Sequence, residues 1–188
     1  VRPPADAPAV EPAPAWRGGW RHGLSYGALG LPLAFVALPL YVVLPHHYAS
    51  TFGLPLATLG AVLLGARLLD AFTDPLIGRW TDRRFAQSPR AVLALGGMAA
   101  VLLALGFALL FFPPTHEPGA LVLYATALLV VTYAAYSTLS VTHQSWGAML
   151  GGDEAQRSHI VAWREGLGLA GVLLMLAVCI QREYWFCV

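Results

Sequence analysis

Five long apolar segments limit what this chain can fold into. A helix needs about 20 mainly apolar residues to cross a bilayer, and each segment is long enough. Charged residues make up only 11% of the 188 residues, whereas a soluble domain carries about 25%. The chain is therefore predicted to be an all-α membrane protein with spans at Leu24–Leu44, Phe52–Phe72, Ala91–Phe112, Gly119–Ser140 and Ile160–Ile180.

The two ends of the chain differ in composition from the predicted helical bundle at 23–180. Residues 1–22 begin with a stretch rich in Pro and Ala and are predicted to form a disordered tail. Residues 181–188 depart abruptly from the apolar run before them. We interpret that ending as aberrant, as expected of a truncated or frameshifted reading frame.

Arginine is distributed unequally between the links that connect the predicted spans. Only Arg182 falls on one side of the membrane, and Arg67 lies within a span. By the positive-inside rule the arginine-rich side faces the cytoplasm. The sequence therefore predicts a multi-pass protein of a bacterial inner membrane whose N-terminus is cytoplasmic. The arginines on that side are Arg2, Arg17, Arg21, Arg79, Arg83, Arg84, Arg90, Arg157 and Arg164.

Composition and motifs disfavour two further classes of function. The net charge is +1 and the sequence has no long basic run, which argues against nucleic-acid binding. The chain has no H-E-x-x-H, C-x-x-C or phosphate-loop motif, so we expect neither an enzyme nor a cofactor. Cys179 and Cys187 lack metal-ligand spacing. The partners expected are the lipid bilayer and a small-molecule substrate.

Three charged residues fall within or at the end of the second segment. Arg67, Asp70 and Asp74 have the spacing i, i+3 and i+7, which places them within roughly 60° of one another on a helix. Charges in a spanning helix are costly and face a partner or a water-filled cavity. One interpretation is that the carboxylates bind a coupling cation, Na⁺ or a proton. The alternative is a structural pair between Arg67 and one aspartate.

The fourth segment carries a polar stripe, and a tyrosine opens the first. The stripe could line a substrate path, or it could form hydrogen bonds between helices, which is the more ordinary role of such residues. For His143, beside it, we expect a satisfied interfacial histidine. Tyr26 stands among glycines in a segment that Pro32 and Pro39 interrupt, and we count it, with Arg67, among the candidate substrate-path residues. The stripe consists of Tyr133, Ser137, Ser140 and Gln144, with Tyr136 adjacent.

Several stretches resemble a known transporter family. The sequence from Gly78 through Asp82 and Arg83 is similar to the G-x-x-x-D-[RK] signature of major facilitator transporters. Within that superfamily, the R-x-x-D-A-x-x-D-P string at 67–75 resembles the glycoside–pentoside–hexuronide:cation symporters, the melibiose permease-like family. The opening L-S-Y-G at 24–27 and A-W-R-E at 162–165 support the same resemblance, which covers roughly residues 22–180.

The resemblance implies a secondary transporter that uses Na⁺, H⁺ or Li⁺ to drive sugar uptake by alternating access. Asp70 and Asp74 match the cation carboxylates of helix two, and Arg67 matches the arginine one turn before them. Arg164 looks like the helix-five arginine near the sugar. Asp82 and Arg83 would pair at the cytoplasmic face and hold the outward-open state, in a link that includes Gly78.

The chain departs from the family pattern in three ways. It reads Gly30-Leu-Pro-Leu where the family has a sugar-binding acid in helix one, and Ser140 stands where some members have a helix-four acid. The family has twelve helices in two halves, whereas five are predicted here. We therefore expect a piece of the N-terminal six-helix half, inactive alone because transport needs the second half. Alternatives are a drug or lipid exporter, or a non-transporting membrane partner or degenerate remnant.

Overall fold

The computed structural model describes residues 19–150 and 153–186, and every regular element among them is a helix. Five stretches are long and apolar enough to cross a membrane, which confirms the predicted number of spans. The first span consists of α1 (Trp20–Gly27), α2 (Gly30–Leu38), a π-helical turn (Pro39–Val43) and α3 (Leu44–Phe52). The others are α4 (Leu56–Gln87), α5 (Pro89–Phe111), α6 (Pro118–Met149) and α7 (Glu154–Phe186).

Several helices extend beyond the predicted segments. Helix α4 continues to Gln87, so the G-x-x-x-D-[RK] segment is helical rather than a link. Helix α1 begins at Trp20, inside the stretch predicted as tail, while residues 1–18 lie outside the described residues. Helix α7 continues through Phe186, beyond the predicted end of the fifth span at Ile180. Hydropathy marks only the apolar part of a helix, and these helices include polar turns at their ends.

The first span is interrupted twice, and proline explains both positions. Pro32 has no amide hydrogen, and its ring crowds the carbonyl four residues earlier, at Ala28, where α1 gives way to α2. Pro39 begins the π-helical turn, which closes with the Leu44 amide donating to the Pro39 carbonyl. Gly53 then ends α3 in the left-handed region at φ 68°, a conformation that suits glycine and lets the chain turn into α4.

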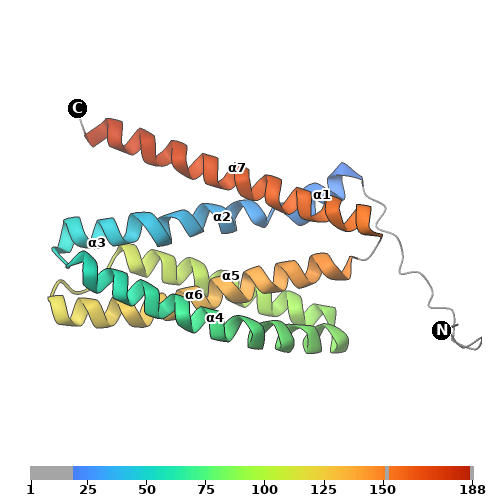
Figure 1. Cartoon of the computed structure of the whole chain (residues 1–188), viewed down its shortest axis with the longest axis horizontal. Helices are drawn as coiled ribbons and strands as arrows, with labels where there is room; N and C mark the ends of the chain where they lie inside the picture. The colour runs from blue at the N-terminus through green and yellow to red at the C-terminus, as the bar shows by residue number, and fades with distance from the viewer. Residues whose placement is uncertain (1–18, 151–152, 187–188) are drawn as a thin grey trace, which may run out of the picture.

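The helices alternate in direction and form two groups, one of α4, α5 and α6 and one of α7 with α1 and α2 (Figure 1). Helices α4 and α5 both pack on α6, whereas α7 packs along α1 and α2. The larger apolar core joins the second half of the first span to α4, α5 and α6. Tyr48 links α3 to α5 within this core, because its buried hydroxyl donates to the Leu110 carbonyl at 2.8 Å.

Helix α7 meets the first span through glycines that allow very close approach. A Cβ atom at Gly27 would lie 2.6 Å from the Trp163 carbonyl oxygen, and one at Gly30 would lie 2.7 Å from the Arg164 carbonyl oxygen. A Cβ atom at Gly171 would overlap the Leu31 carbonyl oxygen. Small residues of this kind let membrane helices bring their backbones together. The α1–α2–α7 contact therefore depends on the absence of side chains.

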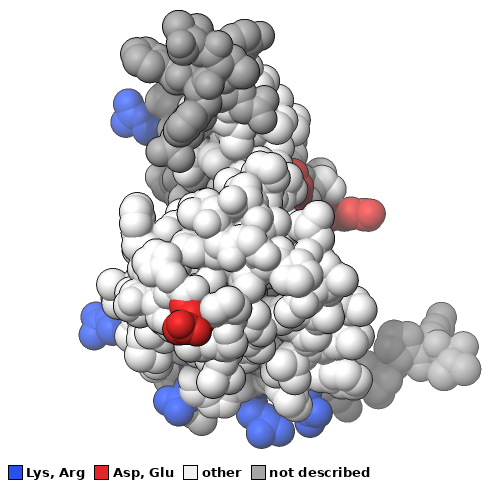
Figure 2. Space-filling model, turned by 90° about the vertical axis from the view of Figure 1, so that its left-hand side faces the viewer, with Lys and Arg blue, Asp and Glu red and all other residues white. Residues whose placement is uncertain are grey.

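The outer surface is mostly apolar, and most of the described arginines lie at one end of the bundle. Large apolar side chains are exposed along α4, α5 and α7, as expected for helices that face lipid. The start of α1, the end of α4 and the start of α7 share the end of the bundle where the described arginine-rich turns lie (Figure 1). Figure 2 looks onto the opposite end, where most described side chains are uncharged. The cytoplasmic orientation of the arginine-rich end remains a prediction.

Candidate functional site

Helix α4 presents Arg67, Asp70 and Asp74 at the junction with α6 and the first span. Asp70 is buried, with 8% of its surface exposed, and its carboxylate lies 3.6 Å from Nη1 of Arg67. The Arg67 side chain is 48% exposed, so this pair forms at the edge of the bundle rather than in its core. The structural pairing that the sequence left open therefore exists, and it involves Asp70 rather than Asp74.

Asp74 has a different partner, which comes from the polar stripe of α6. The Ser137 hydroxyl donates a hydrogen bond to Oδ1 of Asp74. Ser137 is buried, and Asp74 is half-buried. The bond joins residues 63 positions apart and fixes one face of α4 against α6. The two aspartates thus lie one turn apart, one beside a cation and one beside a hydroxyl.

Two stacked tyrosines hold the Arg67 side chain. Its guanidinium carbon lies 3.9 Å from the ring centroid of Tyr41 and 5.4 Å from that of Tyr133. The two rings are 5.5 Å apart and nearly parallel, at 16°. A cation over an aromatic face is attracted by the ring quadrupole. The buried Tyr133 hydroxyl has no hydrogen-bond partner among the described residues.

Sequence reasoning missed Tyr41. It found Arg67 and Tyr133 from helical spacing within one segment, but Tyr41 lies on the first span and belongs to no polar stripe. Spacing within one helix cannot tell which residue of a neighbouring helix it meets. The signal that could have found Tyr41 is an aromatic residue at mid-span in a helix with few other polar groups.

The remaining predicted path residues do not join this cluster through any contact within the described ranges. Ser140 and Gln144 bond to each other at 3.1 Å along α6. Arg164 forms an ion pair with its neighbour Glu165, with 2.6 Å between Nη2 and Oε1. Tyr26 contacts α6 nearer the arginine-rich end. The predicted path therefore divides into a site on α4 and scattered polar contacts elsewhere.

The predicted gating motif is also arranged differently from the expectation. Asp82 and Arg83 are both exposed, and no ion pair joins them in residues 19–150. Consecutive residues on a helix point about 100° apart, so the helical continuation of α4 separates their side chains. Gly78 lies on the α6 side of α4, where a Cβ atom would meet Val141 at 3.9 Å. The structure therefore shows no Asp82–Arg83 pair, and the gating role of the motif stays a prediction.

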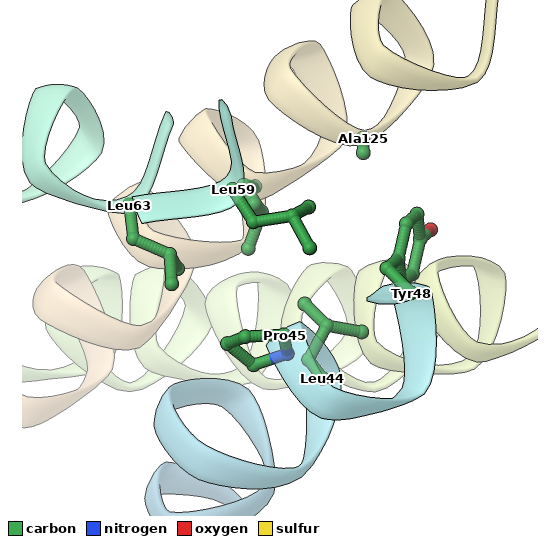
Figure 3. A pocket seen from close by; sticks show the side chains of 7 residues that line it. Leu44, Pro45, Tyr48, Leu59, Leu63 and Ala125 are labelled. Atoms are coloured by element: carbon green, nitrogen blue, oxygen red, sulfur yellow. The ribbon is translucent and has the colours of Figure 1, made fainter. Parts of the chain in front are cut away.

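Three cavities of the bundle lie away from the charged cluster. The one in Figure 3 has a volume of about 10 Å³ and is apolar, which is room for a single water molecule. Two larger spaces, of about 350 and 370 Å³, lie between the first span and α5. Of the three charged residues, only Arg67 is exposed at the edge of the bundle. The residues around the small cavity are Leu44, Pro45, Tyr48, Leu59, Leu63, Ala125 and Leu129.

Comparison with known proteins agrees with the fold and with the resemblance. The relatives include "Putative glycoside/cation symporter YagG" of Escherichia coli, 26% identical over 84% of this chain and 34% of its own length. The inner membrane symporter YicJ of the same organism is 26% identical over 81% of the chain and 32% of its own length. No solved structure gives a significant match.

The chain spans about a third of the length of these relatives. A family model described as "MFS/sugar transport protein" matches residues 25–181, which includes all five spans for most of their length. The matched region also contains the α4 charges and their partners on α6 and the first span. This multi-pass, all-helical chain therefore belongs to the MFS/sugar transport protein family of the major facilitator superfamily.

Proposed function

We propose that this chain forms the cation-binding part of a symporter that moves a sugar or related small solute by alternating access. The observation that carries the proposal is the arrangement of Asp70 and Asp74 on one face of α4, with Ser137 of α6 bound to Asp74. Carboxylate and hydroxyl oxygens are ligands that suit hard cations. Family membership supports a transporter, and the name of one relative supports a glycoside as solute.

Charge balance supports a monovalent coupling ion. Arg67 contributes one positive charge, and Asp70 and Asp74 contribute two negative charges, so the cluster carries a net charge of −1. An uncompensated charge within a spanning helix is costly. One Na⁺, Li⁺ or H⁺ would neutralise the cluster. A divalent ion would leave a net positive charge, which disfavours Ca²⁺ or Mg²⁺.

The exposed side chain of Arg67 indicates where the solute and the second half of the transporter would meet this cluster. The Arg67 side chain is about half exposed, and the described cavities lie elsewhere. In transporters built from two halves, the substrate site lies between the halves. A full-length protein would therefore hold its solute against this face of α4, and the 188-residue chain would bind the cation without transporting the solute.

The proposal is tested by the effect of cations on the stability of the purified chain. A ligand that binds the folded state at 100 times its Kd stabilises it by about 2.7 kcal/mol. We expect NaCl, LiCl or a lower pH to raise the apparent Tm in detergent relative to choline chloride at equal ionic strength. The proposal is contradicted if none of the three conditions raises the Tm.

Replacement of Ser137 by alanine should weaken this cation effect. The change removes the hydroxyl that orients the Asp74 carboxylate, and a hydrogen bond to a charged group contributes about 1.5–3 kcal/mol. We expect the cation concentration for half-maximal stabilisation to rise about 10- to 100-fold. Ser140→Ala is the matched control because Ser140 bonds to Gln144 on the same helix and not to α4. Equal titration curves for the two variants would contradict this role of Ser137.

A further inference from the structure

The interruption of the first span leaves the Tyr26 backbone carbonyl without its helical partner. In a continuous helix the Gly30 amide would donate to the Tyr26 carbonyl. Helix α1 ends at Gly27 and α2 begins at Gly30, and no backbone amide of the described residues donates to the Tyr26 carbonyl. An unpaired carbonyl inside a membrane protein is costly, because no water replaces the lost bond. The Tyr26 carbonyl therefore needs a donor from elsewhere.

His143 of α6 supplies that donor. Its Nε2 atom lies 2.9 Å from the Tyr26 carbonyl oxygen, although the two residues are 117 positions apart. A carbonyl oxygen can only accept a hydrogen bond, so Nε2 must carry the proton. His143 is buried, with 7% of its surface exposed. This contact agrees with the expectation that His143 is a satisfied interfacial histidine, and it identifies which group satisfies it.

Tyr26 forms a second hydrogen bond with His143, through its own hydroxyl. Gly147 leaves space for that hydroxyl. The Tyr26 hydroxyl donates to the His143 carbonyl oxygen at 3.1 Å, and the two rings lie 4.5 Å apart. A Cβ atom at Gly147 would overlap the Tyr26 hydroxyl. The contact is thus reciprocal, with each side chain bonded to the other residue's main chain.

We propose that His143 is a positioning residue that fixes the bend of the first span by donating Nε2–H to the Tyr26 carbonyl. The same span carries Tyr41, whose ring lies against Arg67 in the candidate cation site. A change in the bend would therefore move Tyr41 relative to α4. This link between the bend and the cation site rests on the proposed function, whereas the hydrogen bond and the bend do not.

The bend is measured by the distance between spin labels at its two ends. Labels are attached through His22→Cys and His46→Cys, which are exposed positions before and after the interruptions, in a background with Cys179→Ala and Cys187→Ala. A straight helix would separate the two α-carbons by about 36 Å. We expect a single narrow distance in the parent and in His143→Gln, whose amide can donate from a similar position. We expect His143→Leu to lose that narrow distance.

Two further measurements separate positioning from general damage to the fold. His159→Leu, at an exposed position at the start of α7, should leave the distance distribution unchanged. The ¹⁵N spectrum of the histidine-labelled parent, assigned by comparison with His143→Gln, should show a protonated Nε2 at His143. An unprotonated Nε2, or a His143→Leu distribution identical to that of the parent, would overturn the proposal. Neither readout involves a cation or a solute, so failure of the proposed function would be seen separately.

Discussion

Replacement of Asp74 by asparagine is expected to abolish the cation-dependent rise in the Tm of this chain. The amide keeps the size of the carboxylate and can still accept the hydrogen bond from Ser137. It removes one negative charge, so the cluster with Arg67 and Asp70 becomes neutral without a bound cation. A neutral cluster has no electrostatic reason to bind a monovalent ion. The stabilisation of about 2.7 kcal/mol at 100 times the Kd should fall to near zero.

Asp70→Asn is also expected to abolish the cation-dependent rise in Tm, because it too removes one negative charge from the cluster. It also removes the charge that pairs with Arg67, whose guanidinium keeps its place over Tyr41 and is about half exposed. The folded state should therefore survive, and helical content by circular dichroism should match that of the parent. In a full-length relative that carries these residues, either change should abolish cation-coupled accumulation of the solute.

Asp82→Asn is the matched control for both variants. Asp82 lies on the same helix, is exposed, and takes no part in the cluster. Its variant should respond to cations as the parent does, because the net charge of the cluster is unchanged. If Asp70→Asn and Asp74→Asn both kept the full cation response, neither carboxylate would be a cation ligand. If Asp82→Asn lost the response as well, the effect would follow the charge of the whole chain.

The number of spans could be predicted from the sequence because hydropathy measures transfer into lipid directly. The helix ends could not, because hydrogen bonding along the backbone continues where the side chains become polar. The stretch from Gly78 to Arg83 shows the difference. Its charges place it outside the apolar segment, and it is nonetheless part of α4. The same continuation explains why Asp82 and Arg83 diverge instead of pairing.

The sequence could predict those residues of the candidate site that share one helix, because their spacing places them on the same face. The i, i+3, i+7 spacing found Arg67, Asp70 and Asp74, and the polar stripe of α6 included Ser137. Which hydroxyl of the stripe meets which carboxylate depends on the relative height and rotation of α4 and α6. Tyr41 and the acceptor of His143 depend in the same way on the bends of the first span, which proline positions suggest without fixing their geometry.

Packing between the first span and α7 gives the largest expected effect on stability. Gly171→Ala adds a single methyl group, which would overlap the Leu31 carbonyl oxygen. Because the obstacle is backbone, the two helices must move apart, and overpacking of this kind costs about 1–3 kcal/mol. At about 2–4 °C for each kcal/mol, the apparent Tm should be roughly 2–12 °C below that of Gly166→Ala, which gains the same helix propensity without the overlap. Thermal unfolding in detergent, followed by circular dichroism, measures this change.

Two other glycines of α7 serve as controls for the contact between Gly171 and Leu31. A Cβ atom at Gly166 would meet no atom within 4 Å, and one at Gly168 would lie 3.8 Å from the Gly30 carbonyl oxygen, an ordinary contact. Gly166→Ala should leave the Tm unchanged or raise it, because alanine favours a helix over glycine by about 1 kcal/mol. Gly168→Ala should resemble Gly166→Ala. Equal melting of all three variants would mean that α7 does not pack on the first span through Gly171, since helix propensity alone treats the three positions alike.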